Sequence, residues 1–201
     1  AEAKALLAAA GVAVPRAVTA ADPQSLSEAA SGLRFPLVLK GLGIAHKTEA
    51  GAVVLNLGDP AELRARAEAL PAPGGFLAEE MVAGATAEIL VGVTRDATGL
   101  LALTLAAGGV LAELLVDSAT LVLPARRAEI GAALDGLRLG RLLAGYRGQP
   151  PADRAALLDA IAAIAAFAGS RAGRIAEVEV NPLLATPTGA VAVDALVRMT
   201  R

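Results

Sequence analysis

The sequence has no cysteine and few aromatic residues, and these absences exclude several kinds of chemistry. Without cysteine the chain forms no disulfide and offers no thiolate, as expected of a protein in a reducing cytoplasm. Aromatic residues make up only 2% of the sequence, which weakens the case for a platform on which nucleic-acid bases stack. The net charge is −2 and no run of basic residues occurs, so we expect no nucleic-acid partner.

Long apolar runs are also absent. The longest uncharged stretch, 97–112, contains three glycines and is shorter than the roughly 20 apolar residues that span a membrane. The first four residues include a glutamate and a lysine and do not form a basic region before an apolar core, which is unlike a secretory signal. We therefore expect a cytoplasmic chain with no membrane partner. Its 201 residues are enough to bury a sizeable core in one or two compact units.

Short strand patterns and helix patterns are mixed along the chain, which indicates an α+β fold. Helices are expected at 1–10, 24–31, 125–134 and 152–168, and a further one begins at Asp59-Pro60, a favourable N-cap with proline in the first turn. Strands are expected at 36–40, 52–57, 76–82, 86–94, 99–106 and 119–123. The helix at 152–168 is amphipathic, with an apolar stripe made of Leu157, Leu158, Ile161, Ile164 and Phe167.

The most informative polar residues lie near the end of the chain. Residues 176–184 and 191–194 alternate like strands, and Pro182 with the turn at 186–189 predicts a hairpin that closes the chain. Such a hairpin brings the Asn181 amide oxygen beside the Asp194 carboxylate. Glu179 lies two residues before Asn181 and therefore points to the same strand face. Three hard oxygen ligands predict a Mg²⁺ site that takes its remaining ligands from water and nucleotide phosphates.

These segments resemble the metal-binding end of ATP-grasp domains, in particular those of NDP-forming acyl-CoA synthetases, relatives of succinyl-CoA synthetase. The resemblance continues through most of the chain, in order, at 35–40, 46–53, 79–82, 88–93, 108–113 and 147–151. It implies that residues 1–201 form one ATP-grasp domain of two α/β lobes with nucleotide between them. The smaller, nucleotide-binding lobe is expected at 12–78, and the larger lobe with the metal site at 1–11 and 79–201.

The resemblance also implies a set of nucleotide contacts. Lys40 ends an apolar strand, where its ammonium would reach phosphates, although the pattern alone favours a solvated lysine. Residues 79–82 would form the hinge between lobes and read the adenine edge, with solvated glutamates at a strand end as the alternative. Gly108 and Gly109 would bring backbone N–H groups to phosphate, or form an ordinary turn. The expected contacts are Lys40, Glu79, Glu80, Met81, Val82, Gly108, Gly109 and, at the ribose, Glu88.

Three further residues are candidates for the chemistry. His46 is the only histidine, and it lies in a loop with several glycines. Imidazole is nucleophilic near neutral pH, and the family's matching histidine is implicated in phosphoryl relay, so the resemblance implies a phosphohistidine. Lys47 would attract the phosphate, and Glu113 matches a family glutamate that orients phosphohistidine or binds metal. The pattern alone favours an exposed loop histidine for His46, and Glu113 fits a surface carboxylate equally well.

The resemblance thus implies an acid–thiol ligase component, the phosphoryl-transfer module for acyl-CoA + NDP + phosphate ⇌ acid + CoA + NTP. Its cofactors would be Mg²⁺ and ATP or ADP, with GTP or GDP left open. No glycine-rich dinucleotide fingerprint follows a strand, so the CoA-binding and ligase module is expected on another subunit or another part of the polypeptide. One alternative is a non-catalytic, regulatory ATP-grasp domain of a synthetase-like protein acyltransferase. The other is an interaction domain that uses the apolar surface of helix 152–168 and binds no nucleotide.

Overall fold

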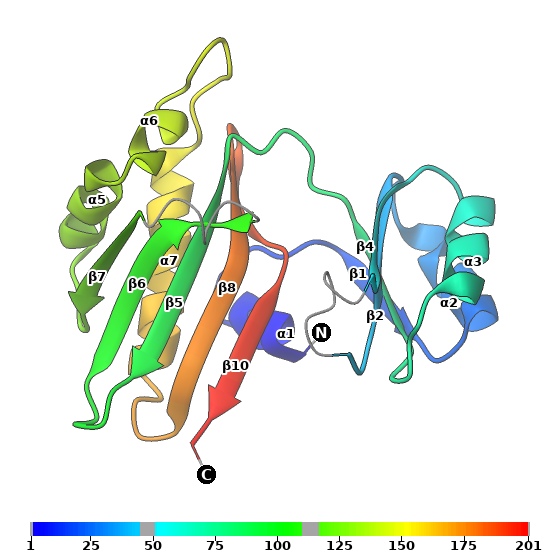
Figure 1. Ribbon diagram of the computed structural model, residues 1–201, viewed down its shortest axis with the longest axis horizontal. Coiled ribbons are helices and arrows are strands. Elements are labelled where there is room, and N and C mark those ends of the chain that lie inside the picture. The colour runs from blue at the N-terminus through cyan, green and yellow to red at the C-terminus, as the bar shows by residue number, and fades with distance from the viewer. Residues whose placement is uncertain (1, 45–50, 110–116, 201) are drawn as a thin grey trace. The chain divides into compact units, whose positions relative to one another are not determined.

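The computed structural model describes residues 2–44, 51–109 and 117–200. The chain divides into two compact units, a larger one formed by Ala1–Val14 and Gly84–Arg201 and a smaller one formed by Pro15–Ala83. Each has its own antiparallel sheet, its own helices and its own hydrophobic core, as an α+β fold requires (Figure 1). No helix in the part of the chain that the structure describes is long and apolar enough to cross a membrane.

The smaller unit is a four-stranded sheet in the order β1-β4-β2-β3. Its elements are β1 (Ala17–Ala20), α2 (Pro23–Ala29), the 3₁₀ turn η1 (Ala30–Gly32), β2 (Leu37–Gly41), β3 (Val53–Leu57), α3 (Pro60–Ala69) and β4 (Phe76–Glu80). Both helices begin at an aspartate N-cap followed by proline: Asp22 accepts the Ser25 N–H and Asp59 the Glu62 N–H. The helices cover one face of the sheet, where Leu26, Leu39 and Leu63 are fully buried (Figure 1).

The larger unit is built on a six-stranded sheet in the order β10-β8-β5-β6-β7, with β9 also paired to β8. Its strands are β5 (Ala87–Arg95), β6 (Leu101–Ala107), β7 (Ser118–Val122), β8 (Ile175–Thr186), β9 (Gly189–Ala192) and β10 (Ala195–Met199). Its helices are α1 (Glu2–Ala9), α5 (Arg127–Gly136), α6 (Leu139–Leu143) and α7 (Arg154–Gly169). The predicted hairpin is present as β8 and β9, with Thr186 opposite Gly189. It does not close the chain, because the backbone bends at Asp194 and continues as β10.

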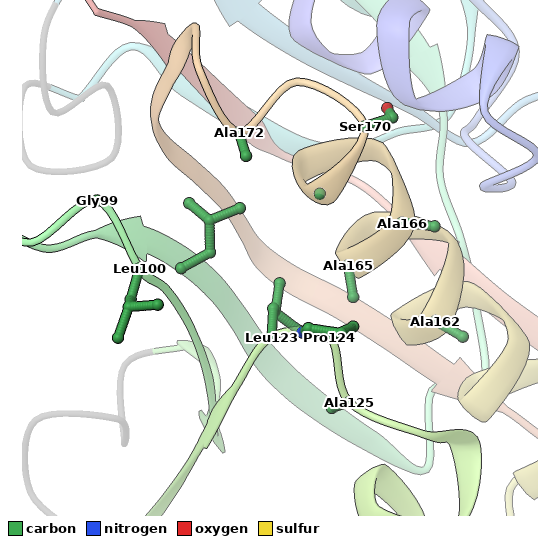
Figure 2. A pocket seen from close by; sticks show the side chains of 12 residues that line it. Gly99, Leu100, Leu123, Pro124, Ala125, Ala162, Ala165, Ala166, Ser170 and Ala172 are labelled. Carbon is green, nitrogen blue, oxygen red and sulfur yellow. The ribbon is translucent and has the colours of Figure 1, made fainter.

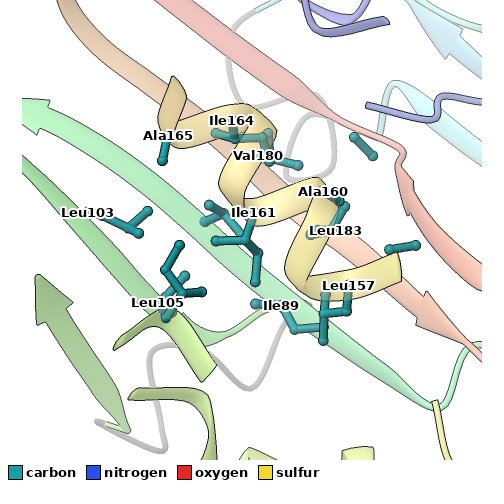
Figure 3. Packing of buried hydrophobic residues seen from close by; sticks show 14 of the residues in the cluster. Ile89, Leu103, Leu105, Leu157, Ala160, Ile161, Ile164, Ala165, Val180 and Leu183 are labelled. Carbon is teal, nitrogen blue, oxygen red and sulfur yellow. The ribbon is translucent and has the colours of Figure 1, made fainter. Parts of the chain in front are cut away.

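Helix α7 packs its apolar stripe onto one face of this sheet. Figure 3 shows Leu157, Ile161 and Ile164 directed toward Ile89 and Val180, and all five are fully buried. Each such side chain stabilises the fold by about 1.5–3 kcal/mol relative to exposure. The stripe predicted from the sequence is therefore core, and it is not available as the interaction surface that one alternative reading required.

Candidate functional site

The predicted metal ligands lie where strand β8 departs from regular pairing. On its β5 side, Leu90 alone lies opposite two residues, Asn181 and Pro182, which is a β-bulge. Val180 before the bulge and Leu183 after it both face the core, although an unbroken strand would point them to opposite faces. The extra residue thus places Asn181 on the face away from α7. Bulges often re-aim a side chain in this way next to functional sites.

The other neighbour of β8 is irregular at the same level. Between β9 and β10, Val193 and Asp194 lie opposite Pro182 and Asn181. The Asn181 N–H donates to the Asp194 carbonyl and the Val193 N–H to the Pro182 carbonyl, both at 3.2 Å. The Ala195 N–H donates to Asp194 Oδ1 at 3.0 Å, which restrains that carboxylate. The structure therefore brings Asn181 and Asp194 together, with Asp194 in a bend rather than in a strand.

Glu179 lies on the same strand face as Asn181, two residues earlier, and is half-buried. Burial raises the pKa of Glu179 above its ordinary value, and the nearby carboxylates of Glu177 and Asp194 raise it further, while Arg198 lowers it. Burial disfavours the charged form and like charges add to that effect. A cation at this position would offset the repulsion among these carboxylates.

The side chains of Glu179, Asn181 and Asp194 suit a hard cation that takes only some of its ligands from the protein. Glu179 and Asp194 offer carboxylate oxygens and Asn181 an amide oxygen, the ligand types that Mg²⁺ prefers. Within the described residues no three His, Cys, Asp or Glu side chains gather as a metal cage. By residue type, the three fit an ion such as Mg²⁺, which usually keeps several waters and takes other ligands from phosphates.

The glycine pair after β6 approaches this set closely. The Gly108 N–H donates to the Glu88 carbonyl at 2.8 Å, and the Gly109 N–H to Asn181 Oδ1 at 3.3 Å. Gly109 has a positive φ of 69°, and a Cβ there would lie 2.0 Å from a Glu88 carboxylate oxygen. A side chain here would be strained by the positive φ and would have to displace the Glu88 carboxylate, so glycine is favoured at this position. Gly109 therefore lies beside both Glu88 and Asn181, and its N–H donates to the Asn181 side chain.

In the smaller unit, Lys40 and Glu79 form an ion pair between neighbouring strands β2 and β4. They are 7% and 1% exposed, so the alternative readings as a solvated lysine and a solvated glutamate are both wrong. Neighbouring residues Leu39 and Ala78 face α2 and α3 in the core, so Lys40 and Glu79 point to the opposite face of the sheet. Buried charges need such pairing, because removing either partner leaves the other uncompensated.

Glu80, Met81 and Val82, the other residues of the expected hinge, are less buried than Glu79. Glu80 ends β4, and its carboxylate accepts Arg16 at 3.1 Å and Arg34 at 2.9 Å. The hydrogen bond from Arg34 is the main cause that holds the pKa of Glu80 below its ordinary value. Met81 and Val82 follow the strand, half-buried, just before the division between the units. The Glu80 side chain is therefore already engaged within the smaller unit.

The three residues expected to carry the chemistry, His46, Lys47 and Glu113, lie outside the described residues. Their roles stay predictions. The glycine pair ends just before the second of these gaps, and β2 ends shortly before the first.

An apolar cavity lies elsewhere in the larger unit. It measures about 500 Å³ and lies between α7 and the start of β6, where Leu100, Leu123, Pro124 and Ala165 line it (Figure 2). None of its lining residues is charged. The glycine pair lies after the other end of β6, roughly 20 Å away along a strand of this length. This apolar cavity is therefore unsuited to phosphate and separate from the polar site.

Comparisons with known proteins identify the family of this chain. A family model described as an ATP-grasp domain matches residues 1–199, so the chain belongs to the ATP-grasp family. Trans-feruloyl-CoA synthase FCS1, from an unknown prokaryotic organism, is 34% identical over 215 residues, covering 100% of this chain but only 30% of that protein. The beta subunit of ADP-forming acetate–CoA ligase II from Pyrococcus furiosus is 28% identical, covering 96% of this chain and 88% of the subunit.

A solved structure has the same fold along nearly the whole chain. The dinucleotide-forming acetyl-coenzyme A synthetase 1 of Candidatus Korarchaeum cryptofilum, in complex with coenzyme A and Ca-AMPCP, matches with a TM-score of 0.88 at 27% identity. The match covers 99% of this chain and 91% of that chain. Another structure of that synthetase holds Mg-AMPPCP, with a phosphohistidine segment pointing towards the nucleotide site, and matches with a TM-score of 0.83.

Proposed function

We propose that this chain is the nucleotide-binding, phosphoryl-transfer module of an ADP-forming acyl-CoA synthetase. One observation carries the proposal: Asp194 lies opposite Asn181 at the broken pairing of β8, Glu179 lies on the same strand face two residues earlier, and the Gly109 N–H donates to Asn181 Oδ1. This ligand set on an ATP-grasp chain, together with relatives named as acyl-CoA ligases, supports binding of a Mg²⁺-nucleotide. A bound Mg²⁺ would neutralise charge on the nucleotide phosphates.

The chain's own residues would position the nucleotide. Asp194 and Glu179 supply charge and Asn181 a neutral oxygen at the cation site. In the smaller unit, Lys40 supplies the ammonium for phosphate, and Glu79 holds that ammonium until a phosphate competes for it. Phosphoryl transfer needs little covalent help from the protein, so positioning and electrostatic stabilisation would supply most of the catalysis.

The proposal includes a covalent step at His46. In the direction of ATP synthesis, an imidazole nitrogen of His46 takes the phosphoryl group from a phosphohistidine of the CoA-binding module. A terminal oxygen of ADP then displaces it, which forms ATP and regenerates the imidazole. Lys47 would attract the phosphoryl group by charge, and Glu113 would orient the imidazole. The chain would therefore need the CoA-binding module, on a partner subunit or in the same polypeptide, to make acyl-CoA.

Calorimetry with ATP or ADP tests the first part. Binding should require Mg²⁺, and Asp194→Asn should weaken it by about 1–3 kcal/mol, the scale of a lost charged contact. Asp159→Asn is the matched control, because Asp159 is an exposed aspartate on α7 whose recorded partner is Arg127 at 2.8 Å. Equal affinity with and without Mg²⁺ would rule out the metal assignment.

Labelling tests the covalent step. With the partner module, Mg²⁺ and γ-labelled ATP, the wild-type chain should carry acid-labile, base-stable phosphate, and His46→Ala should carry none. Because His46 is the only histidine of the chain, no other imidazole can take the label. Nucleotide binding should survive in this variant.

If His46→Ala supports full turnover, phosphate passes directly between nucleotide and partner. Nucleotide binding by a chain that remains inactive with its partner would favour the regulatory alternative.

A further inference from the structure

Lys4 is a buried lysine that the site described so far does not use. It lies on α1 and is only 6% exposed. Its Nζ donates to the Val193 carbonyl at 3.2 Å. Burying an ammonium is unfavourable unless it is hydrogen-bonded, and an uncharged side chain of similar length would fill the same space without that penalty. The charge at this position therefore calls for a reason other than packing.

The Val193 carbonyl, which accepts the hydrogen bond from Lys4, belongs to the bend at Val193 and Asp194 beside the proposed cation site. Val193 and Asp194 are joined by one planar peptide, so fixing the Val193 carbonyl also fixes the direction of the Asp194 N–H. The rest of the bend is tied to β8 by the two main-chain hydrogen bonds with Asn181 and Pro182. Lys4 thus reaches the same peptide from α1, a segment far away in the sequence.

We propose that Lys4 is a positioning residue for the cation site. Its ammonium holds the Val193–Asp194 peptide in the orientation that directs the Asp194 carboxylate to the Asn181 amide oxygen. Lys4 itself touches neither nucleotide nor cation. The inference rests on the proposed function. It extends that function because it gives α1 a role in positioning Asp194, one of the proposed metal ligands. Groups that orient metal ligands in this way commonly govern metal affinity.

The experiment compares Lys4→Met, Lys4→Gln and Lys4→Arg in the 201-residue chain. The first readout is the Mg²⁺ concentration that half-saturates nucleotide binding, and the second is amide hydrogen exchange at Asn181 and Ala195. We expect Lys4→Met and Lys4→Gln to raise that concentration by about 10-fold, the low end for a group that supports metal ligands. Faster exchange at both amides should accompany the change. Lys4→Arg keeps a charged donor and should recover part of the affinity.

Leu7→Ala is the matched control for stability. Leu7 lies one turn along the same helix, is fully buried in the core, and does not belong to the bend. It should lower the melting temperature while leaving the Mg²⁺ dependence of the folded chain unchanged. The inference is overturned if both uncharged Lys4 variants keep the wild-type Mg²⁺ dependence, or if Leu7→Ala shifts it equally. If the wild type shows no Mg²⁺ dependence, the proposed function fails first.

Discussion

The two units place their polar residues in different ways. In the smaller unit, Lys40 and Glu79 lie within an unbroken ladder between β2 and β4, on the face away from the helices. In the larger unit, Asn181 and Asp194 lie where the ladder of β8 is interrupted on both sides. Regular pairing supplies a rigid, buried pair of charges. Interrupted pairing places Asn181 opposite the Asp194 bend, and this arrangement combines a bulge, a bend and the contact with Gly109.

Breaking the Lys40–Glu79 ion pair should give the largest effect. Lys40→Met removes the ammonium that is paired with the buried Glu79 carboxylate, so we expect a loss of about 3–5 kcal/mol in the free energy of unfolding. Nucleotide affinity should fall as well, because the proposed function assigns Lys40 to the nucleotide phosphates. Denaturant unfolding and calorimetry measure the two effects.

The double variant Lys40→Met/Glu79→Leu separates these two effects. Replacing both charges with apolar side chains should restore most of the stability, since buried pairs are often replaceable by packing. Nucleotide affinity should remain low. A double variant that is stable and binds nucleotide normally would show that Lys40 is structural only.

Gly109→Ala disturbs the interrupted pairing around Asn181 in the larger unit. A side chain at a φ of 69° and so near the Glu88 carboxylate should lower the free energy of unfolding by about 1–3 kcal/mol. It should also weaken Mg²⁺-nucleotide binding, because the Gly109 contact with Asn181 shifts. Gly99→Ala is the control, with a φ of 89° in a turn beside Arg95 at the other end of β6. If both variants weaken binding equally, the contact with Asn181 is not important.

Glu179→Gln should have opposite effects on the stability of the larger unit and on its binding of Mg²⁺-nucleotide. The folded-state pKa of Glu179 is raised, so its ionisation disfavours the folded state, and stability is lost as the pH rises through that pKa. We therefore expect the variant to melt slightly higher than wild type at neutral pH and to need more Mg²⁺ for nucleotide binding. Thermal melts at pH 4 and pH 7 check the sign, and a variant that is less stable at neutral pH would contradict it.

The smallest effect is expected from Glu80, which belongs to the regular sheet but lies at its end. Its folded-state pKa is lowered from the ordinary 4.5, so its contribution to stability is present at neutral pH and is lost as the pH falls through the folded-state pKa. Glu80→Gln should therefore melt a little lower than wild type at neutral pH, with the difference vanishing in acid. A difference that persists at low pH would point to packing instead of charge.

Local patterns were sufficient to predict the pairing of Asn181 with Asp194. Both lie beside strand-like alternation, and the turn at 186–189 fixes which residues of the hairpin face each other. The same rules predicted the buried stripe of α7, because helical periodicity is encoded in neighbouring residues. Features of this kind need no information about distant parts of the chain.

Other features depend on contacts between distant segments, and the sequence did not reveal them. Lys4 lies in an ordinary Ala/Leu-rich helix, and only the docking of α1 near the bend explains why it is buried. The pairing of Lys40 with Glu79 requires the register of β2 against β4. Strands β1 and β10 and helix α6 were not predicted from the sequence.

The interruption of β8 has a consequence for folding as well. A regular strand can slip along its neighbours, and pairing alone does little to prevent it. Here Asn181 and Pro182 must lie opposite Leu90 on one side and the Asp194 bend on the other. A slipped β8 would set its bulge against regular strands and turn either Val180 or Leu183 out of the core. Asn181 and Pro182 thus also help to fix the register of β8, because a shifted pairing would lose the match of bulge and bend.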